Sequence, residues 1–219
     1  MKLDAAQLLE LERQLGKPEG EFGMAVANEM NKSNYGIIHD AFERLNIKNG
    51  QNILELGHAN GEHVLNLLEN LQSIHYSGLE ISTLMHNEAI RINEKHIRNG
   101  KAKFELYDGN LIPERDLFFD SIITVNTLYF WEKPIDLMNE IHRVLATDGF
   151  FVLAFVKKDF MQDLPFVNDG FSLYNNADVS KLVSQSKFKT AEFLDREEEV
   201  QSKDNTFVNR KYSLAIIRK

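Results

Sequence analysis

Short apolar runs alternate with longer amphipathic stretches through the middle of this chain of 219 residues. Five runs of five to seven residues have the length and composition of buried strands, at 52–56, 75–81, 103–107, 120–126 and 150–156. Helical periodicity separates most of them, over 61–71, 83–97 and 134–145. Strands that alternate with helices form βαβ units, in which helices cover both faces of a parallel sheet. The pattern therefore predicts an α/β protein with a doubly wound, mostly parallel sheet.

The two ends of the chain differ from this middle part. Leucines recur at near-helical spacing over 2–15, and a second helix is expected over 34–45. After the fifth strand, a helix is expected over 177–186, followed by strand-like runs at 190–197 and 209–219. We expect the last two strands to form an antiparallel pair, which brings the sheet to seven strands.

One domain accounts for the whole chain, because 219 residues close a single core. We divide 1–219 into a helical N-terminal cap (1–45), a cofactor-binding core (46–156) and a C-terminal part (157–219) that holds an acceptor-side insertion and the last strands. The absence of cysteine excludes disulfides and thiolate zinc sites, and a net charge of −8 disfavours nucleic acid as a partner.

Location and assembly are constrained less by the sequence. No apolar run approaches the ~18 residues that a membrane span needs. The N-terminus also lacks the apolar core of a secretory signal, so a cytoplasmic protein is expected. The sequence leaves open whether the chain forms a homodimer.

The first strand ends in a turn of small residues, in the sequence ILELGHANGEH (53–63). Gly57 can adopt backbone angles that are closed to other residues, while Ala59 and Gly61 are expected to let a ligand approach the main chain. In open α/β sheets the ligand lies outside the carboxyl ends of the strands, often at this first turn. The next helix directs its free N–H groups there. We therefore expect the ligand at this corner, with Glu55 just before it.

The spacing of the small residues separates two classes of ligand. A dinucleotide fingerprint needs small residues at its first, third and sixth positions, and Glu62 occupies the sixth. The order Glu55, Gly57, Ala59, Gly61 instead resembles motif I of the class I S-adenosylmethionine-dependent methyltransferases. Their cofactor carries positive charge, which an acidic surround suits. The resemblance extends over about residues 50–156 and implies the Rossmann-like methyltransferase fold.

The resemblance also implies further cofactor contacts. Glu80 ends the second strand, where the family has an acid that binds both ribose hydroxyls, and a carboxylate has two oxygens for that diol. Asp108, in the sequence YDGN, resembles the family's acid near the adenine amino group. The implied cofactor-binding residues are Glu55, Gly57, His58, Ala59, Gly61, Glu80, Ile81, Asp108, Gly109, Asn126 and Tyr35.

A member of this family would be an enzyme that transfers a methyl group to a small-molecule acceptor. Among relatives, the ubiquinone/menaquinone-biosynthesis type is the most similar. Two departures are Ala59, where the family has its middle glycine, and the turn at 146–148, which lacks the usual proline. Two alternatives stay open: an NAD-dependent oxidoreductase in which Glu80 holds a ribose, and a non-catalytic cofactor-binding module.

Two segments are expected to cover the pocket. Residues 21–38 mix large apolar side chains with glycine and asparagine, which suits a mobile cover. Because relatives close an N-terminal helix over the cofactor, Asn31, Asn34 and Tyr35 are candidate contacts. The insertion at 159–174 is rich in aromatic residues and is expected to shape a site for an apolar or planar acceptor.

The sequence assigns no catalytic residue, because methyl transfer from a sulfonium requires mainly positioning and exclusion of water. If the acceptor needs a base, the candidates are Tyr129, His142 and His39. The seven histidines lack the spacing of metal ligands, so no metal site is expected.

Overall fold

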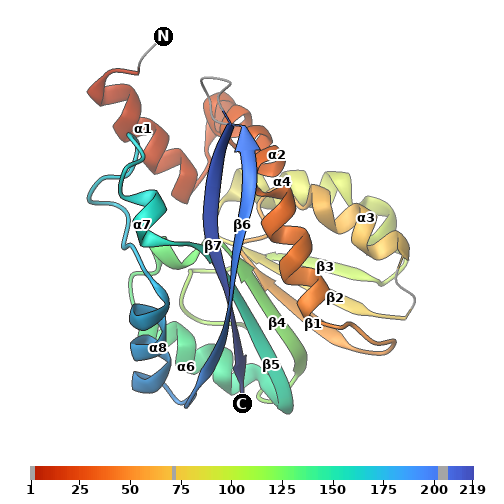
Figure 1. Ribbon diagram of the computed structural model, residues 1–219. Helices are drawn as coiled ribbons and strands as arrows, with labels where there is room; N and C mark the ends of the chain where they lie inside the picture. The colour runs from red at the N-terminus through yellow and green to blue at the C-terminus, as the bar shows by residue number, and fades with distance from the viewer. Residues whose placement is uncertain (1–2, 71–72, 202–206) are drawn as a thin grey trace.

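The computed structural model describes residues 3–70, 73–201 and 207–219. Within these ranges, seven strands form one sheet in the order β3–β2–β1–β4–β5–β7–β6 (Figure 1). The strands are β1 (Asn52–Leu56), β2 (His75–Glu80), β3 (Ala102–Leu106), β4 (Phe119–Val125), β5 (Leu145–Val156), β6 (Ala191–Gln201) and β7 (Phe207–Arg218). Strands β1 to β5 are parallel, whereas β7 is antiparallel to both β5 and β6. The predicted fold class is confirmed, including the antiparallel C-terminal pair.

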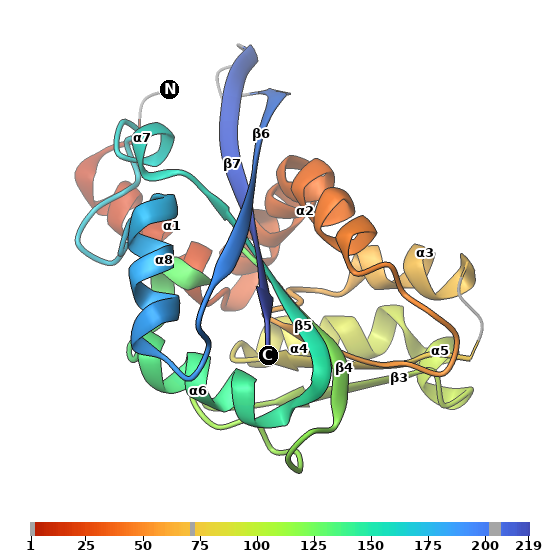
Figure 2. The same ribbon diagram turned by 60° about the horizontal axis from the view of Figure 1, so that its bottom comes forward.

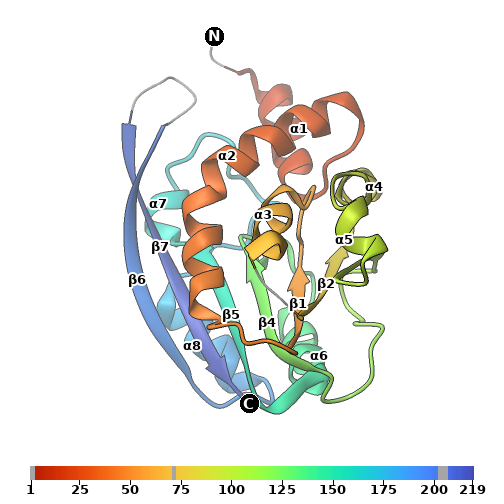
Figure 3. The same ribbon diagram turned by 90° about the vertical axis from the view of Figure 1, so that its right-hand side faces the viewer.

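Helices cover both faces of this sheet. Figures 2 and 3 show α2 and α3 on one face and α6 and α8 on the other, as the reversal of strand order at β1 and β4 requires. The helices are α1 (Ala5–Gly16), α2 (Gly20–Arg44), α3 (Glu62–Asn70), α4 (Thr83–Ile92), α5 (Glu94–Arg98), α6 (Pro134–Val144), α7 (Lys158–Met161) and α8 (Asn176–Gln185). A 3-10 turn spans Leu128–Phe130.

Helix α2 is longer than the sequence pattern predicted. The expected start at residue 34 is wrong, because the helix begins at Gly20 and includes the whole segment (21–38) expected to be a mobile cover. The glycines that suggested a loop instead allow close packing. An added Cβ at Gly23 would lie 2.6 Å from the Gln14 side chain, and one at Gly36 would overlap the Glu198 carboxylate. Small size here permits helix docking rather than chain mobility.

Other boundaries differ by a few residues. The helix expected over 83–97 is divided at Asn93, whose side-chain amide donates to the backbone oxygens of Gly61 (2.9 Å) and Ala89 (3.1 Å). The first helix begins at Ala5, and its predicted start at Lys2 lies outside the described residues. The predicted end of the helix after β1, at Leu71, also lies outside them. In the described part of the chain, no helix combines the length and apolarity that a membrane crossing requires.

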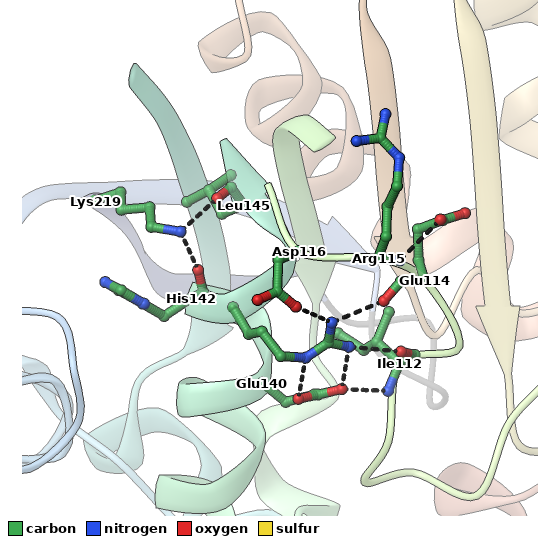
Figure 4. A network of polar contacts seen from close by, with 9 residues as sticks. Ile112, Glu114, Arg115, Asp116, Glu140, His142, Leu145 and Lys219 are labelled. Carbon is green, nitrogen blue, oxygen red and sulfur yellow. Dashed lines mark hydrogen bonds and ion pairs between the residues drawn. The ribbon is translucent and has the colours of Figure 1, made fainter. Parts of the chain in front are cut away.

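The long loop between β3 and β4 is fixed to α6 through one arginine. The Arg143 guanidinium donates to the backbone oxygens of Ile112 (2.9 Å) and Glu114 (2.8 Å), and to the carboxylates of Asp116 and Glu140. Figure 4 shows these groups converging beside the last turn of α6. Because the same loop begins at the carboxyl end of β3, this network also constrains the region around Asp108.

Candidate functional site

A cavity of about 390 Å³ lies at the carboxyl ends of β1, β2, β3 and β4, beneath α2. This is the edge where the order of the strands predicts a ligand. Its wall includes nine of the eleven predicted cofactor-binding residues: Glu55, Gly57, His58, Ala59, Glu80, Ile81, Asp108, Gly109 and Asn126. Gly61 and Tyr35 are not on this wall.

Glu80 ends β2 and is directed at the glycine turn. Its Oε2 accepts the Ala59 N–H at 3.0 Å, and its Oε1 accepts the N–H groups of Ile81 (2.7 Å) and Ser82 (2.9 Å). Burial raises the pKa of Glu80 to about 7, although these backbone donors act in the opposite direction. A carboxylate has about four acceptor positions, so one remains free, on Oε2.

The turn after β1 contains three residues with positive φ: Gly57, Ala59 and Gly61. Gly57 (φ +75°) receives the side chain of Thr127 where a Cβ would lie, and its N–H donates to Leu79 at 2.8 Å. Ala59 also has a positive φ, of +50°, which is unfavourable for an L-residue with a Cβ. Its hydrogen bond to Glu80 helps to hold that conformation.

Gly61 has a role that differs from the expected one. A Cβ there would lie 3.1 Å from both the Ala89 side chain and the Asn93 amide. Its small size therefore lets the turn pack on α4, and the expectation that it lets a ligand approach the main chain is not supported by its position.

Glu55 is buried beneath the turn in a polar cluster. Its carboxylate accepts the Tyr76 hydroxyl at 2.5 Å and is bonded to His63 Nε2 at 2.9 Å. Burial opposes ionisation, but the charge and hydrogen bond of His63 and the Tyr76 hydroxyl hold the pKa of Glu55 below its ordinary value. Glu55 thus stays ionised, and its hydrogen bonds are made to His63 and Tyr76.

The ring of His58 packs inward against β2 and β3. It meets Phe104 edge-on, with ring centres 4.9 Å apart, and lies over Gly78, where a Cβ would be 2.6 Å from its Cδ2. Burial lowers the pKa of His58 to about 4, so the ring is neutral near pH 7. Neither ring nitrogen is bonded to a described residue.

Asp108 combines a turn with a place on the cavity wall. Its side chain accepts the N–H groups of Asn110 and Leu111, each at 2.8 Å. These hydrogen bonds lower the pKa of Asp108, and the bond from the Leu111 N–H has the largest effect. The same turn places Gly109 (φ +82°) on the wall.

Helix α2 supplies the roof through two asparagines. Asn31 donates to Asn60 Oδ1 (2.9 Å) and Glu62 Oε2 (2.7 Å), while Asn34 Oδ1 accepts the Asn126 amide at 3.2 Å. Both lie on the cavity wall, as expected. Tyr35, the next residue, is 66% exposed and lines a second cavity instead.

None of the three candidate bases lines the first cavity. The buried Tyr129 hydroxyl bonds to Asn126 Oδ1 and to the backbone of Val156, and burial raises its pKa. His142 lies beside Leu145, at the amino end of β5 and so at the opposite edge of the sheet (Figure 4). His39 lines the second cavity. Among the described residues, no group of three or more acidic or histidine side chains could hold a metal ion.

Wall residues that were not predicted from the sequence include His63 and Met85, whereas Met30 and Ile38 lie in the segment expected to cover the pocket. Phe130 and Trp131 also line the cavity, and the 3-10 turn after β4 sets their orientation. The insertion at 159–174 supports this wall from behind, because Phe171 packs on Phe130 with ring centres 4.8 Å apart. None of its residues is on the wall of the first cavity.

The residues of this cavity fit S-adenosylmethionine. The carboxylates of Glu55, Glu80 and Asp108 provide an acidic surround for a cationic ligand. The free acceptor position on Glu80 Oε2 lies beside the turn, where a hydroxyl donor would meet it. A dinucleotide pyrophosphate would instead face this negative charge.

Residues 54–153 match the protein family described as Methyltransferase domain. A relative from Bacillus subtilis, the uncharacterized methyltransferase YdaC, is 27% identical over 107 residues, which are 48% of this chain and 56% of that protein. The chain thus matches little more than half the length of this relative.

Two solved structures share the fold at low identity. A SAM-dependent methyltransferase from Aquifex aeolicus gives a TM-score of 0.63 at 16% identity, over 99% of this chain and 100% of that one. Geranyl diphosphate C-methyltransferase from Streptomyces coelicolor gives a TM-score of 0.66 at 11% identity, over 94% of this chain and 84% of that one. The latter was solved with S-adenosyl-L-homocysteine. This chain therefore has the Rossmann-like methyltransferase fold, and its residues 54–153 carry the match to the methyltransferase-domain family.

Proposed function

We propose that this protein is an enzyme that uses S-adenosylmethionine to methylate a small-molecule acceptor. The observation that carries the proposal is the position of Glu80, whose carboxylate is fixed at the tip of β2 beside the glycine turn. The family match over 54–153 supports the same reading.

Each group of wall residues has a part in this proposal. Glu80 would accept a ribose hydroxyl on Oε2, and a second hydroxyl could bind if the Ala59 N–H gave up its bond. Ile81, Asp108 and Gly109 would bind the adenine side. Bound S-adenosylmethionine would supply a methyl group activated by a positively charged sulfur. The protein would orient the acceptor and exclude water, the latter through α2.

The wall near Asn126 points to the acceptor class. Phe130 and Trp131 bring aromatic surface to that end of the cavity, and Phe171 supports Phe130 from behind. Aromatic walls favour planar or apolar ligands. An acceptor of this kind agrees with the resemblance to the ubiquinone/menaquinone-biosynthesis enzymes.

Calorimetry with S-adenosylhomocysteine tests the proposal. We expect saturable binding in the micromolar range, and transfer of labelled methyl from S-adenosylmethionine to a member of a panel of planar small molecules. If S-adenosylhomocysteine gives no binding heat and NADH quenches the tryptophan fluorescence of the protein in a saturable way, the oxidoreductase is favoured instead. Binding without transfer to any member of the panel would favour a non-catalytic module.

A further inference from the structure

The single tryptophan of the chain, Trp131, lies on the wall of the first cavity near Asn126. It directly follows the 3-10 turn, and its indole Nε1–H donates to Thr127 Oγ1 at 3.0 Å. Because this N–H is the only polar group of the ring, its bond to Thr127 leaves carbon surface for a ligand. The orientation of that surface therefore depends on Thr127.

Thr127 is bonded in turn to the end of β1, through Thr124. The Thr124 Oγ1 lies 2.7 Å from Leu56 O and 2.6 Å from Thr127 Oγ1. A carbonyl oxygen only accepts, so Thr124 donates its one hydroxyl proton to Leu56 and accepts the hydroxyl of Thr127. An indole only donates, so Thr127 accepts from the ring. The three bonds form one directed chain from the indole to the end of β1, in which each hydroxyl proton has a single assignment.

Both ends of this chain lie in the candidate site. Leu56 is the last residue of β1 and precedes Gly57, and the Thr127 methyl group occupies the place where a Cβ on Gly57 would lie. Thr124 is the register partner of Leu56 in the parallel pair of β1 and β4, two strands that Figure 3 shows side by side. Thr127 thus contacts the turn proposed to hold the cofactor and also the ring at the acceptor end.

The residue before Thr127 directs the chain into this position. Asn126 has a φ of +57°, a conformation that asparagine adopts more readily than most residues, and its N–H donates to Ala154 O at 2.9 Å. Its side-chain amide donates to Asn34 at 3.2 Å, and its Oδ1 accepts the Tyr129 hydroxyl at 3.0 Å. With Asn126 held on both sides, the backbone of Thr127 is fixed above Gly57.

We propose that Thr127 is a positioning residue that couples the cofactor turn to the acceptor wall, because it holds the Trp131 ring in one orientation relative to Gly57. A ligand that shifts the turn would move Thr127 and the indole with it. Binding at the cofactor end then changes the shape of the acceptor end, and by linkage the reverse also holds. The inference rests on the proposed function, since it takes the ligand of the turn to be S-adenosylmethionine.

Fluorescence tests the inference, because all tryptophan emission comes from Trp131. Thr127→Val keeps a methyl group over Gly57 but can neither accept from the indole nor donate to Thr124. Its ligand-free emission should shift to longer wavelength, with stronger quenching by acrylamide, because the released indole N–H turns to water. Thr124→Val breaks the same chain at the next bond and should shift the emission in the same direction. Thr127→Ser keeps the hydroxyl and should emit as the wild type does, as should Thr147→Val, an exposed threonine in β5.

Titration with S-adenosylhomocysteine measures the coupling. Its binding should change the emission of the wild type, Thr127→Ser and Thr147→Val, with the midpoint that calorimetry gives. Thr127→Val should still bind it in the calorimeter, at most about tenfold more weakly, but should lose most of the emission change. Urea titrations of the same proteins show that each variant is folded.

Three results would overturn the inference. The first is wild-type emission and wild-type acrylamide quenching in Thr127→Val. The second is a full emission change when that variant binds S-adenosylhomocysteine, and the third is binding to the wild type with no emission change. Failure of the proposed function looks different: S-adenosylhomocysteine would give no heat with the wild type, while the ligand-free spectra of Thr127→Val would still show the shift. In that case the positioning of Trp131 by Thr127 stands and the assignment of the ligand fails.

Discussion

The Glu80 carboxylate and the Ala59 N–H are joined by a 3.0 Å hydrogen bond that ties the tip of β2 to the turn after β1. This bond fixes two features at once, the direction of the carboxylate and the positive φ of Ala59. Because the pairing of β1 with β2 places their ends together, the acid and the turn form one unit. A ligand that binds there would compete with, or share, the acceptor Oε2.

The raised pKa of Glu80 predicts opposite pH dependences for stability and for ligand binding. Its ordinary value is 4.5 and burial raises the pKa to about 7, so the folded protein retains a proton that the unfolded chain releases in this window. The contribution of Glu80 to the free energy of unfolding should therefore fall by roughly 3 kcal/mol as the pH rises through the window. Urea titrations of the wild type and Glu80→Gln at several pH values measure the difference.

Binding of S-adenosylhomocysteine should show the reverse trend, because hydroxyl donors bind the ionised carboxylate. Below pH 7 the affinity should fall by up to about tenfold for each pH unit, and Glu80→Gln should lose this dependence. An affinity that is constant across the window in the wild type would show that the ionisation of Glu80 has no part in binding.

Gly78→Ala should displace the His58 ring, since the new Cβ would lie 2.6 Å from Cδ2 of that ring and 2.9 Å from Phe104. We expect a loss of about 1–3 kcal/mol in the free energy of unfolding, measured in urea, and weaker binding of S-adenosylhomocysteine. Ser77→Ala, one residue earlier and directed to the other face of the sheet, is the control and should change stability by less than about 0.5 kcal/mol. Equal effects of the two substitutions would contradict the packing that we describe.

Arg143→Lys should loosen the loop between β3 and β4. A lysine cannot form the planar fork that bonds two backbone oxygens and two carboxylates at once. We expect a loss of about 1–3 kcal/mol and faster amide exchange over residues 108–117. Arg91→Lys, on the exposed surface of α4 beside Glu88, should be nearly neutral and serves as the matched control. Unchanged exchange in the loop would contradict this role of Arg143.

Arg210 couples the C-terminal hairpin to the roof of the cavity. Its guanidinium pairs with Glu198 at 2.7 Å and donates to Ser33 O and to Asn34 Oδ1, which also accepts the Asn126 amide. Arg210→Met should cost about 3 kcal/mol, because the Glu198 carboxylate would be left without its partner. The double variant with Glu198→Gln should recover part of that loss in urea titrations. If the double variant lost as much stability as the two single variants together, the two side chains would not interact.

The sequence predicted the parts of the fold that depend on local pattern. Short apolar runs and small residues at a strand end identify β1, β2 and the turn. The position of Glu80 follows because the ends of adjacent parallel strands lie together. The extent of α2 could not be predicted, since Gly23 and Gly36 read as loop signals until Gln14 and Glu198 are seen to occupy the space above them.

The same limit explains the two predicted contacts that the structure separates from the site. Tyr35 and Asn34 are neighbours in sequence, but on a helix adjacent side chains point in different directions, and only Asn34 faces the first cavity. Gly61 satisfies the motif, yet its bare Cα packs on α4. A motif gives the residue type, whereas tertiary packing decides which surface the residue serves.

Calorimetry of S-adenosylhomocysteine binding to the wild type, Glu80→Ala and Glu105→Ala tests the central claim most directly. Glu105 is an acid on the neighbouring strand β3 that pairs with Lys103 and is absent from the cavity wall, so its loss should leave the affinity unchanged. Our account predicts micromolar binding to the wild type and to Glu105→Ala, and at least about tenfold weaker binding to Glu80→Ala. Equal affinities for all three proteins, or no binding to the wild type, would contradict it.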